Sequence, residues 1–124
     1  GLPDHAMLDM GDFAGGLLKY LRRHPVPRLT IGGGIGKMCK LAQGAMDLHS
    51  GRSQVDLGAL SSWVGQDLTD CNTALEAYTR VGPNLAEAVA QRALNQVKIT
   101  LQDADIKVDT IIIDRAGTII GRAA

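Results

Sequence analysis

The first 46 residues alternate between short apolar runs and stretches in which apolar residues recur at helical spacing. Residues 6–10 predict a strand, residues 28–31 a second strand, and residues 37–46 a helix. Between the two strands, Asp12 stands at the N-cap position of a helix and Pro25 ends that helix. The apolar positions of this helix are Phe13, Leu17, Leu18 and Leu21. A strand–helix–strand unit closes as a right-handed parallel crossover, so both strands would end at the same edge of one sheet.

The rest of the chain predicts three helices and two further strands. Residues 47–56 are polar and predict a loop. Asp70 is the expected N-cap of the second of these helices, and Asn84 with Glu87 forms a capping-box variant at the start of the third. The run "VDTIIID" predicts a buried strand, and residues 118–120 predict a short returning strand. The apolar stripes of the first and third helices are Leu57, Leu60, Val64 and Leu68, and Leu85, Val89, Ala93 and Val97.

These elements predict one α/β domain over residues 1–124. We expect a small, mostly parallel sheet with flanking helices in a Rossmann-like three-layer arrangement. Of the 124 residues, 45% are hydrophobic and only 3% are aromatic, so the chain can bury a core made of aliphatic side chains. The chain begins with Gly1 and reaches its first helix almost at once, so we expect it to be part of a longer protein.

Charge and cysteine content narrow the classes of function. Basic and acidic residues each number 13, and this zero net charge argues against a nucleic-acid binder dominated by phosphate neutralisation. Cys39 and Cys71 form no CxxC motif, so we expect two free thiols in a reducing compartment and no metal site. No run approaches membrane-spanning length and no signal peptide precedes the fold, so we expect a cytoplasmic location without a membrane partner.

The stretch "LTIGGGIGKMCKLAQG", residues 29–44, combines five glycines with two lysines. A phosphate-binding Walker A loop requires glycine at the position of Ile31 and a hydroxyl at the position of Met38, so that motif fails twice. The dinucleotide fingerprint fails as well, because the glycine spacing does not close and no acidic residue follows at the distance that a ribose contact requires.

A more general argument still favours a ligand at this loop. Glycines between a strand and a helix let a ligand approach the backbone, and the helix-start N–H groups together with Lys37 favour an anion. The first strand also ends in a glycine-bearing loop, which contains Gly11 and Asp12. The two loops predict a crevice at the carboxyl ends of adjacent parallel strands. Within the glycine run we assign ligand approach to Gly33, Gly34 and Gly36.

Three motifs occur in order along the chain: "MGDFAGGLL", "GGGIGKMCKLAQG" and "DLHS". They resemble the CbiD family, the cobalt-precorrin-5B C1-methyltransferases of cobalamin (vitamin B12) biosynthesis. That family's pattern is M-G-(D/N)-F-x-G, then G-H-I-G-K-L-x-K-L-A-x-G, then N-T-H-S. The resemblance covers residues 10 to about 53, and beyond them it lies mainly in helix order. Gly34 stands where the pattern has His, and Asp47 and Leu48 replace Asn and Thr, whereas His49 and Ser50 match.

The resemblance implies transfer of a methyl group from S-adenosylmethionine to carbon C1 of a cobalt-bearing tetrapyrrole. The cobalt would belong to the substrate, so no protein metal site is implied. Such a transfer is an in-line displacement at a sulfonium methyl group, which calls mainly for positioning and exclusion of water. The family's proteins are much longer, so this chain resembles their C-terminal domain. Its expected partners are the tetrapyrrole, the missing N-terminal domain and, as an open possibility, further copies of the chain.

The resemblance also assigns tasks to particular residues. The basic residues would contact the carboxylates of the tetrapyrrole, and Asp12 or Asp9 would accept ribose hydroxyl groups. His49 and Asp12 are the candidates for acid–base chemistry, although the sequence names no catalytic base. The binding candidates are Gly11, Asp12, Gly33, Gly34, Gly36, Lys37, Lys40, His49, Ser50 and Arg52.

The alternative is a non-catalytic module that binds an anion or nucleotide, or that acts as a scaffold for a partner. The absence of His at Gly34 favours this alternative. A hydrolase or transferase of phosphate esters is weakened by the failed Walker A motif. Core positions are expected for three further residues with possible chemistry, Cys39, Trp63 and Tyr78, and structural roles for His5 and His24.

Overall fold

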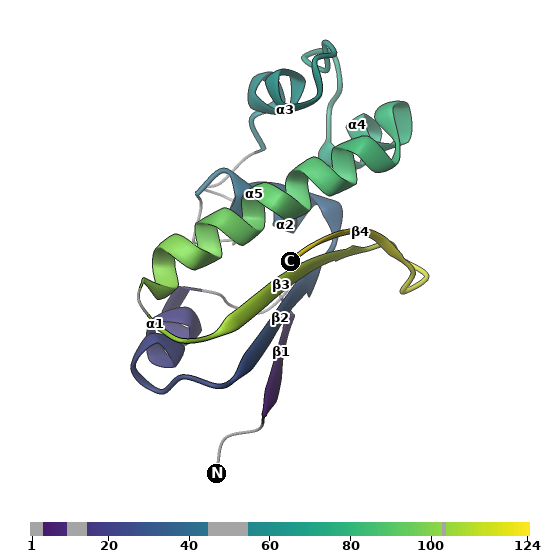
Figure 1. Cartoon of the computed structure of the whole chain (residues 1–124). Helices are drawn as coiled ribbons and strands as arrows, with labels where there is room; N and C mark the ends of the chain where they lie inside the picture. The colour runs from purple at the N-terminus through teal and green to yellow at the C-terminus, as the bar shows by residue number, and fades with distance from the viewer. Residues whose placement is uncertain (1–3, 10–14, 45–54, 103) are drawn as a thin grey trace.

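A computed structural model describes residues 4–9, 15–44, 55–102 and 104–124 of the chain (Figure 1). Five helices and four strands lie in these residues. In chain order they are β1 (His5–Asp9), α1 (Gly15–Arg23), β2 (Arg28–Gly33), α2 (Ile35–Ala42), α3 (Leu57–Val64), α4 (Ala74–Val81), α5 (Pro83–Leu101), β3 (Lys107–Ile113) and β4 (Ile119–Ala123). The predicted cap Asp12 and most of the loop predicted for residues 47–56 lie outside the described residues.

The four strands form one sheet in the order β1-β2-β3-β4. β1 pairs with β2 and β2 with β3 in parallel, whereas β4 turns back and pairs with β3 antiparallel. The parallel crossover predicted between the first two strands is therefore confirmed, and the sheet is mixed because of β4. The carboxyl ends of β1, β2 and β3 meet at one edge, which is on the right of Figure 1.

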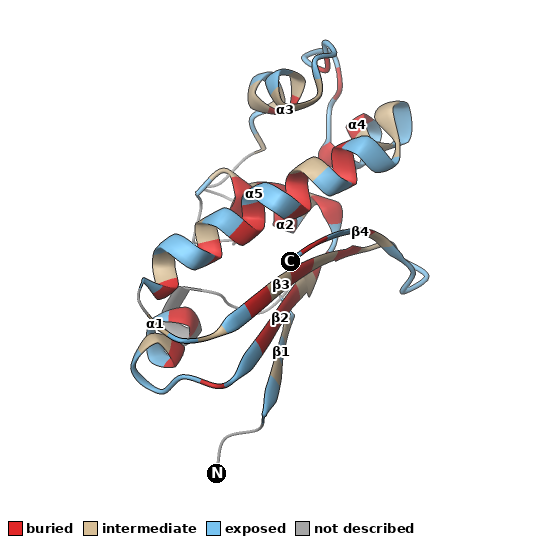
Figure 2. Ribbon diagram, viewed as in Figure 1, coloured by how far each residue is buried: buried red, intermediate tan, exposed pale blue. Residues whose placement is uncertain are grey.

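Helices α2 and α5 pack against one face of the sheet, and α1, α3 and α4 pack against α5. Leu29, Ile31 and Ile112 are fully buried on that face, and the Thr110 hydroxyl donates a 2.6 Å hydrogen bond to the carbonyl oxygen of Ala90 in α5. The opposite face remains largely exposed (Figure 2), and Met7 on it is 70% exposed. The α/β class with flanking helices is thus confirmed, whereas the three-layer arrangement is confirmed only as far as one helical layer over the sheet.

Helix starts differ from the sequence prediction at three places: α2 begins at Ile35 and not at residue 37, and the starts of α4 and α5 differ as well. Thr73, not Asp70, caps α4: its hydroxyl oxygen accepts a hydrogen bond from the N–H of Glu76 at 3.0 Å. The carboxylate of Asp70 instead binds the guanidinium of Arg80 through two hydrogen bonds of 2.6 and 3.1 Å. This pairing, with both partners largely exposed, holds the pKa of Asp70 below its ordinary value.

The helix α5 begins before its predicted cap. Gly82 is its N-cap and Pro83 its first residue, so Asn84 lies inside the helix and does not cap it. Proline suits this position because its ring already has a helical φ and because the first helical N–H has no partner within the helix. The predicted apolar stripe of α5 is confirmed, since Leu85, Val89, Ala93 and Val97 are all fully buried.

The last strand approaches α5 closely. A Cβ atom built on Gly121 would lie 2.8 Å from the backbone of Ala86, so only glycine lets β4 come this near to the helix. This contact fixes the position of β4 and, with it, of the turn that joins β3 to β4 at the carboxyl edge of the sheet.

Candidate functional site

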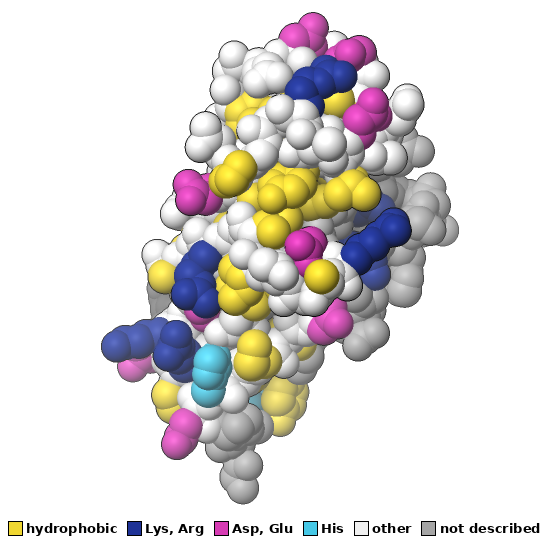
Figure 3. Space-filling view, turned by 90° about the vertical axis from the view of Figure 1, so that its right-hand side faces the viewer, with side chains coloured by type: hydrophobic (Ala, Val, Ile, Leu, Met, Phe, Trp, Pro, Cys, Tyr) yellow, Lys and Arg dark blue, Asp and Glu magenta, His cyan; other side chains and the backbone are white. Residues whose placement is uncertain are grey.

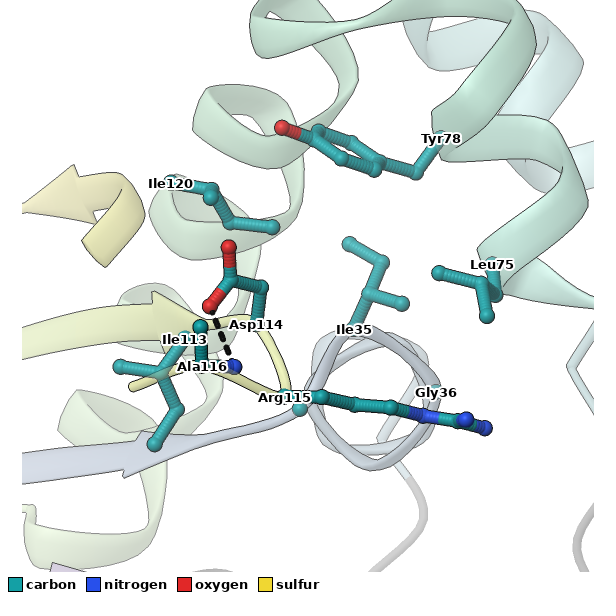
Figure 4. Close-up of a pocket in the computed structure, with 10 residues that line it drawn as sticks. Ile35, Gly36, Leu75, Tyr78, Ile113, Asp114, Arg115, Ala116 and Ile120 are labelled. Carbon is teal, nitrogen blue, oxygen red and sulfur yellow. Dashed lines mark hydrogen bonds between the residues drawn. The ribbon is translucent and has the colours of Figure 1, made fainter. Parts of the chain in front are cut away.

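Two adjoining cavities open at the carboxyl edge of the sheet, with volumes of about 540 Å³ and about 420 Å³. Both are lined by Gly34, Gly36, Ile113, Asp114 and Arg115. We call the larger one, which adds Ile35, Leu75, Tyr78, Ala116 and Ile120, the apolar cavity (Figure 4). The smaller one adds Asp9, Gly33 and Lys37, and we call it the polar cavity. The part of the predicted crevice at residues 33–37 lines this pair of cavities, whereas its other parts lie outside the described residues.

The glycine run contributes one part of the wall that the two cavities share, and residues 113–115 contribute the other. Gly32 and Gly33 continue β2, so this strand extends two residues beyond the prediction. Gly34 is the N-cap of α2, with extended backbone angles of φ −69° and ψ 163°. A Cβ atom built on Gly34 or Gly36 would meet no other atom within 4 Å. Neither glycine is required by a left-handed backbone, so their effect is to leave open space beside the helix start.

The turn between β3 and β4 contributes an acidic group that sequence reasoning missed. One carboxylate oxygen of Asp114, Oδ1, accepts hydrogen bonds from the N–H groups of Ala116 and Thr118, both at 2.9 Å. Gly117 completes the turn with a φ of +82°, which favours glycine. From the sequence, this segment is only the connection between two predicted strands. An acidic residue directly after a buried parallel strand was the signal that could have revealed it, by the same rule that located the glycine loop.

Helix α4 closes the apolar cavity from the other side. Leu75, which is 49% exposed, and the half-buried Tyr78 lie one turn apart on this helix and line the cavity. Figure 4 shows the Tyr78 ring across the cavity from Asp114 and Arg115, with Ile35 and Ile120 between them. Tyr78 packs against the core as predicted, but one side of it also borders the cavity.

The structure brings together part of the predicted site. Gly33, Gly34, Gly36 and Lys37 all line the polar cavity, as predicted for a common crevice. Lys40 is half-buried on α2 and lines neither cavity. The remaining candidates, which are Gly11, Asp12, His49, Ser50 and Arg52, lie outside the described residues.

Comparisons with known proteins place the chain in a family. A family profile described as the C-terminal domain of CbiD matches residues 47–124. The chain belongs to the CbiD family. The profile covers nearly two thirds of the chain, most of it beyond the motifs that carry the resemblance.

Full-length relatives in the CbiD family match nearly the whole chain. A protein of Paramagnetospirillum magneticum is 47% identical over 99% of this chain and 37% of its own length. A protein of Brucella abortus is 47% identical over 98% and 36%, and one of Halorhodospira halophila is 45% identical over the same shares. All three are named cobalt-precorrin-5B C(1)-methyltransferase. The chain thus spans little more than a third of the length of these relatives, and no solved structure matches it.

The other potentially reactive side chains described in this CbiD-family chain are buried in the core or held by contacts with neighbouring residues. Burial raises the pKa of the Cys39 thiol to about 12, so this thiol stays protonated, as expected for a core residue. Trp63 packs against the core beneath the Arg92 guanidinium, 4.7 Å from the ring centre. His24 donates from Nδ1 to the Tyr20 carbonyl at the end of α1, over 3.2 Å. Among the described residues, no three His, Cys, Asp or Glu side chains cluster to hold a metal ion, and no helix has the length and hydrophobicity to cross a membrane.

A hydrogen-bonded chain of polar side chains lies on the face of the sheet that the described helices do not cover. The Thr30 hydroxyl donates to Asp109 at 2.5 Å and lies 2.7 Å from Nε2 of His5. Because the single hydroxyl proton is directed to the carboxylate, Nε2 of His5 carries the proton that it donates to Thr30. Arg28 lies 3.9 Å from the same carboxylate. His5 therefore has the structural role expected of it, as part of a chain that links β1, β2 and β3 across the sheet.

Proposed function

We propose that this chain forms one domain, the C-terminal domain, of an enzyme that methylates carbon C1 of cobalt-precorrin-5B with S-adenosylmethionine as the methyl donor. Membership of the CbiD family and the names of the relatives support the reaction. One structural observation carries the location: the open glycines at the start of α2 face the acidic β3–β4 turn at the carboxyl edge of parallel strands. Open α/β sheets bind their ligands at such edges.

The proposed reaction is an in-line displacement. The ring carbon forms a bond to the methyl carbon while the bond from methyl carbon to sulfur breaks, and the electron pair of that bond stays on sulfur as a neutral thioether. Such a step needs no nucleophile from the protein, so the work of the chain is to position both reactants and to exclude water. Cobalt belongs to the tetrapyrrole in this scheme.

The polar cavity is the proposed seat of the tetrapyrrole's carboxylates. Lys37 in the first turn of α2 and Arg115 in the β3–β4 turn both line it. Cations paired with carboxylates form strong, directional hydrogen bonds, and a helix N-terminus favours the same negative charge. Lys40 and the candidates outside the described residues, His49, Ser50 and Arg52 among them, stay proposals for further contacts of the same substrate.

The exposed face of the sheet is where we expect the longer protein to continue the fold. A helical layer from outside this chain would cover Met7 and its neighbours and complete the three-layer arrangement. The relatives, of which this chain matches 36–37%, contain enough further sequence to supply such a layer.

A calorimetric titration of the 124-residue chain with S-adenosylhomocysteine, the demethylated product, tests the proposal, with ATP as the control ligand. Saturable binding of the first and none of the second is the expected result. Equal binding of both would favour the alternative, a non-catalytic anion-binding module. Binding of neither would locate the donor site elsewhere in the longer protein.

One observation specifically favours that alternative. Gly34 stands where the family motif has His, so this chain has no imidazole at the wall that the two cavities share. The space for it is present, since a Cβ atom on Gly34 meets nothing within 4 Å. The test compares methyl transfer by the longer protein with and without the Gly34→His change. If only the variant transfers the methyl group, the unmodified protein is the non-catalytic alternative.

A further inference from the structure

The two cavities at the carboxyl edge differ in chemistry. Beyond the wall that both cavities share, which includes Arg115, the described residues that line the apolar cavity are Ile35, Leu75, Tyr78, Ala116 and Ile120, with no lysine among them. The polar cavity adds Lys37 and Asp9 instead. Figure 3 shows one face of the molecule, where hydrophobic side chains form a central group with both basic and acidic side chains around it. Two adjoining cavities that differ in polarity suit two reactants that differ in polarity.

We propose that the apolar cavity is the subsite for the adenosine part of the methyl donor. This inference rests on the proposed function and deepens it, because neither the sequence motifs nor the family comparison locates the donor. The cavity volume of about 540 Å³ lies within the range of about 300–1,000 Å³ that is usual for pockets that enclose small ligands. The tetrapyrrole is larger and carries many carboxylates, which an apolar lining would strip of water at a high free-energy cost.

The aromatic ring of Tyr78 provides the surface on which a purine stacks. Tyr78 is half-buried on α4, so its ring is held by packing against the core and loses little conformational freedom when a ligand binds. Leu75 and Ile120 flank it with aliphatic surface. A flat uncharged base gains both stacking and burial of apolar area in this setting.

The carboxylate of Asp114 selects a sugar with hydroxyl groups. Oδ1 is held by two backbone N–H groups, which fixes the orientation of the whole carboxylate. Figure 4 shows the second carboxylate oxygen turned into the cavity, on the side of Ile120 and Tyr78. A carboxylate in this position accepts hydrogen bonds from ribose hydroxyls and attracts the positive charge of a sulfonium.

The shared wall then defines where the reactants meet. Gly34 and Gly36 border both cavities and present no side chain between them. A donor with its adenosine in the apolar cavity places its sulfonium group toward this wall, facing a substrate whose carboxylates are held near Lys37. The two glycines would therefore lie along the path of the methyl group, which is a more specific role than allowing a ligand to approach the backbone.

The test measures S-adenosylhomocysteine affinity by calorimetry in matched pairs of variants. Tyr78→Ala removes the stacking surface, and Tyr20→Ala removes an exposed tyrosine on α1 that lines neither cavity. Leu75→Gln makes the cavity wall polar, and Ile99→Gln makes the same kind of change on the exposed side of α5. We expect affinity to fall roughly tenfold in Tyr78→Ala and Leu75→Gln and to stay unchanged in the two controls.

A ligand-side measurement keeps the test valid if a variant fails to fold. Removal of the 2′-hydroxyl from adenosine should weaken binding about tenfold in the unmodified chain, and Asp114→Asn should abolish that difference while it preserves the Oδ1 acceptor. An Asp114→Asn chain that still discriminates 2′-deoxyadenosine from adenosine would overturn the assignment of the carboxylate.

The outcomes separate this inference from the proposed function. If the unmodified chain binds S-adenosylhomocysteine and the Tyr78 and Leu75 variants bind it equally well, the donor lies elsewhere on the chain: the subsite is then wrong and the methyltransferase proposal survives. If the unmodified chain does not bind it at all, the subsite is also wrong, and the reaction is decided by methyl transfer in the longer protein.

Discussion

Replacement of Gly36 by alanine should move stability and ligand affinity in opposite directions. Gly36 is the second residue of α2 and lies in helical backbone, where glycine loses more conformational freedom on folding than alanine does. The added methyl group meets no other atom within 4 Å, so no steric cost offsets this gain. We expect the free energy of unfolding to rise by about 0.5–1 kcal/mol. For a chain of this size that corresponds to an increase in Tm of roughly 2–5 °C.

The same methyl group projects into space that both cavities use. A ligand that packs against the bare backbone at Gly36 must shift to admit it, and overpacking of this kind costs about 1–3 kcal/mol. S-adenosylhomocysteine should therefore bind the Gly36→Ala chain roughly tenfold or more weakly than it binds the unmodified chain. Urea denaturation followed by circular dichroism gives the stability, and calorimetry gives the affinity.

Gly32→Ala is the matched control for this prediction. Gly32 lies four residues earlier, in β2, and lines neither cavity. A Cβ atom there would lie 2.8 Å from Cγ1 of Ile111, so the same change should destabilise the fold by about 1 kcal/mol. A loss of stability in Gly36→Ala would refute the claim that its space is open. A gain in stability with unchanged affinity would show that the ligand does not use that space.

Three further predictions concern the scaffold. Gly121→Ala should lower stability by about 1–3 kcal/mol in urea denaturation, because its Cβ atom would meet the backbone of Ala86 at 2.8 Å; an unchanged midpoint would contradict the close approach of β4. Thr110→Val should cost about 1–2 kcal/mol in the same assay, since it removes the buried hydrogen bond to Ala90, and a neutral effect would argue against that bond. Burial raises the pKa of the Cys39 thiol from 9.0 to about 12, so between these pH values the unfolded chain ionises and the folded chain does not. Stability should fall as pH rises above 9.0, by up to about 1.4 kcal/mol per pH unit, and a Cys39→Ala chain that shows the same slope would exclude this thiol as the cause.

The local signals in the sequence predicted the elements and the edge of the sheet that carries the cavities. β3 was predictable because "VDTIIID" has the β-branched, apolar composition of a buried strand, although the structure buries only alternate residues of it. The end of β2 was harder to place, because glycine is unfavourable in strands in isolation. Gly32 remains in β2 since strands pair with it on both sides, opposite Asp9 and Ile111. Pairing between distant strands decided that boundary, and a local pattern does not contain this information.

The cap of α4 shows the same limit. Asp70 and Thr73 are both good N-cap residues and lie three positions apart, so local preference does not choose between them. Arg80 decides the matter, because it takes the carboxylate of Asp70 while Thr73 caps the helix. The side chain that settles the start of the helix lies in its last turn, where sequence reasoning did not look for a competitor.

The part of the candidate site that the sequence did not predict depends on the order of the strands in the sheet. Periodicity correctly placed Tyr78 toward the protein interior, but it contains no information about the empty space beside the ring. Asp114 reaches the same cavity only because β3 lies next to β2, so that the end of β3 adjoins the glycine run that follows β2. Residues 34–106 separate these two strands along the chain, so the proximity of their ends is a property of topology alone. Once the order β1-β2-β3 is known, the rule that ligands bind at the carboxyl ends of parallel strands points to Asp114 and Gly34 together. The approach of β4 to α5 at Gly121 fixes that strand beside the turn, which ties the stability of the scaffold to the shape of the cavity.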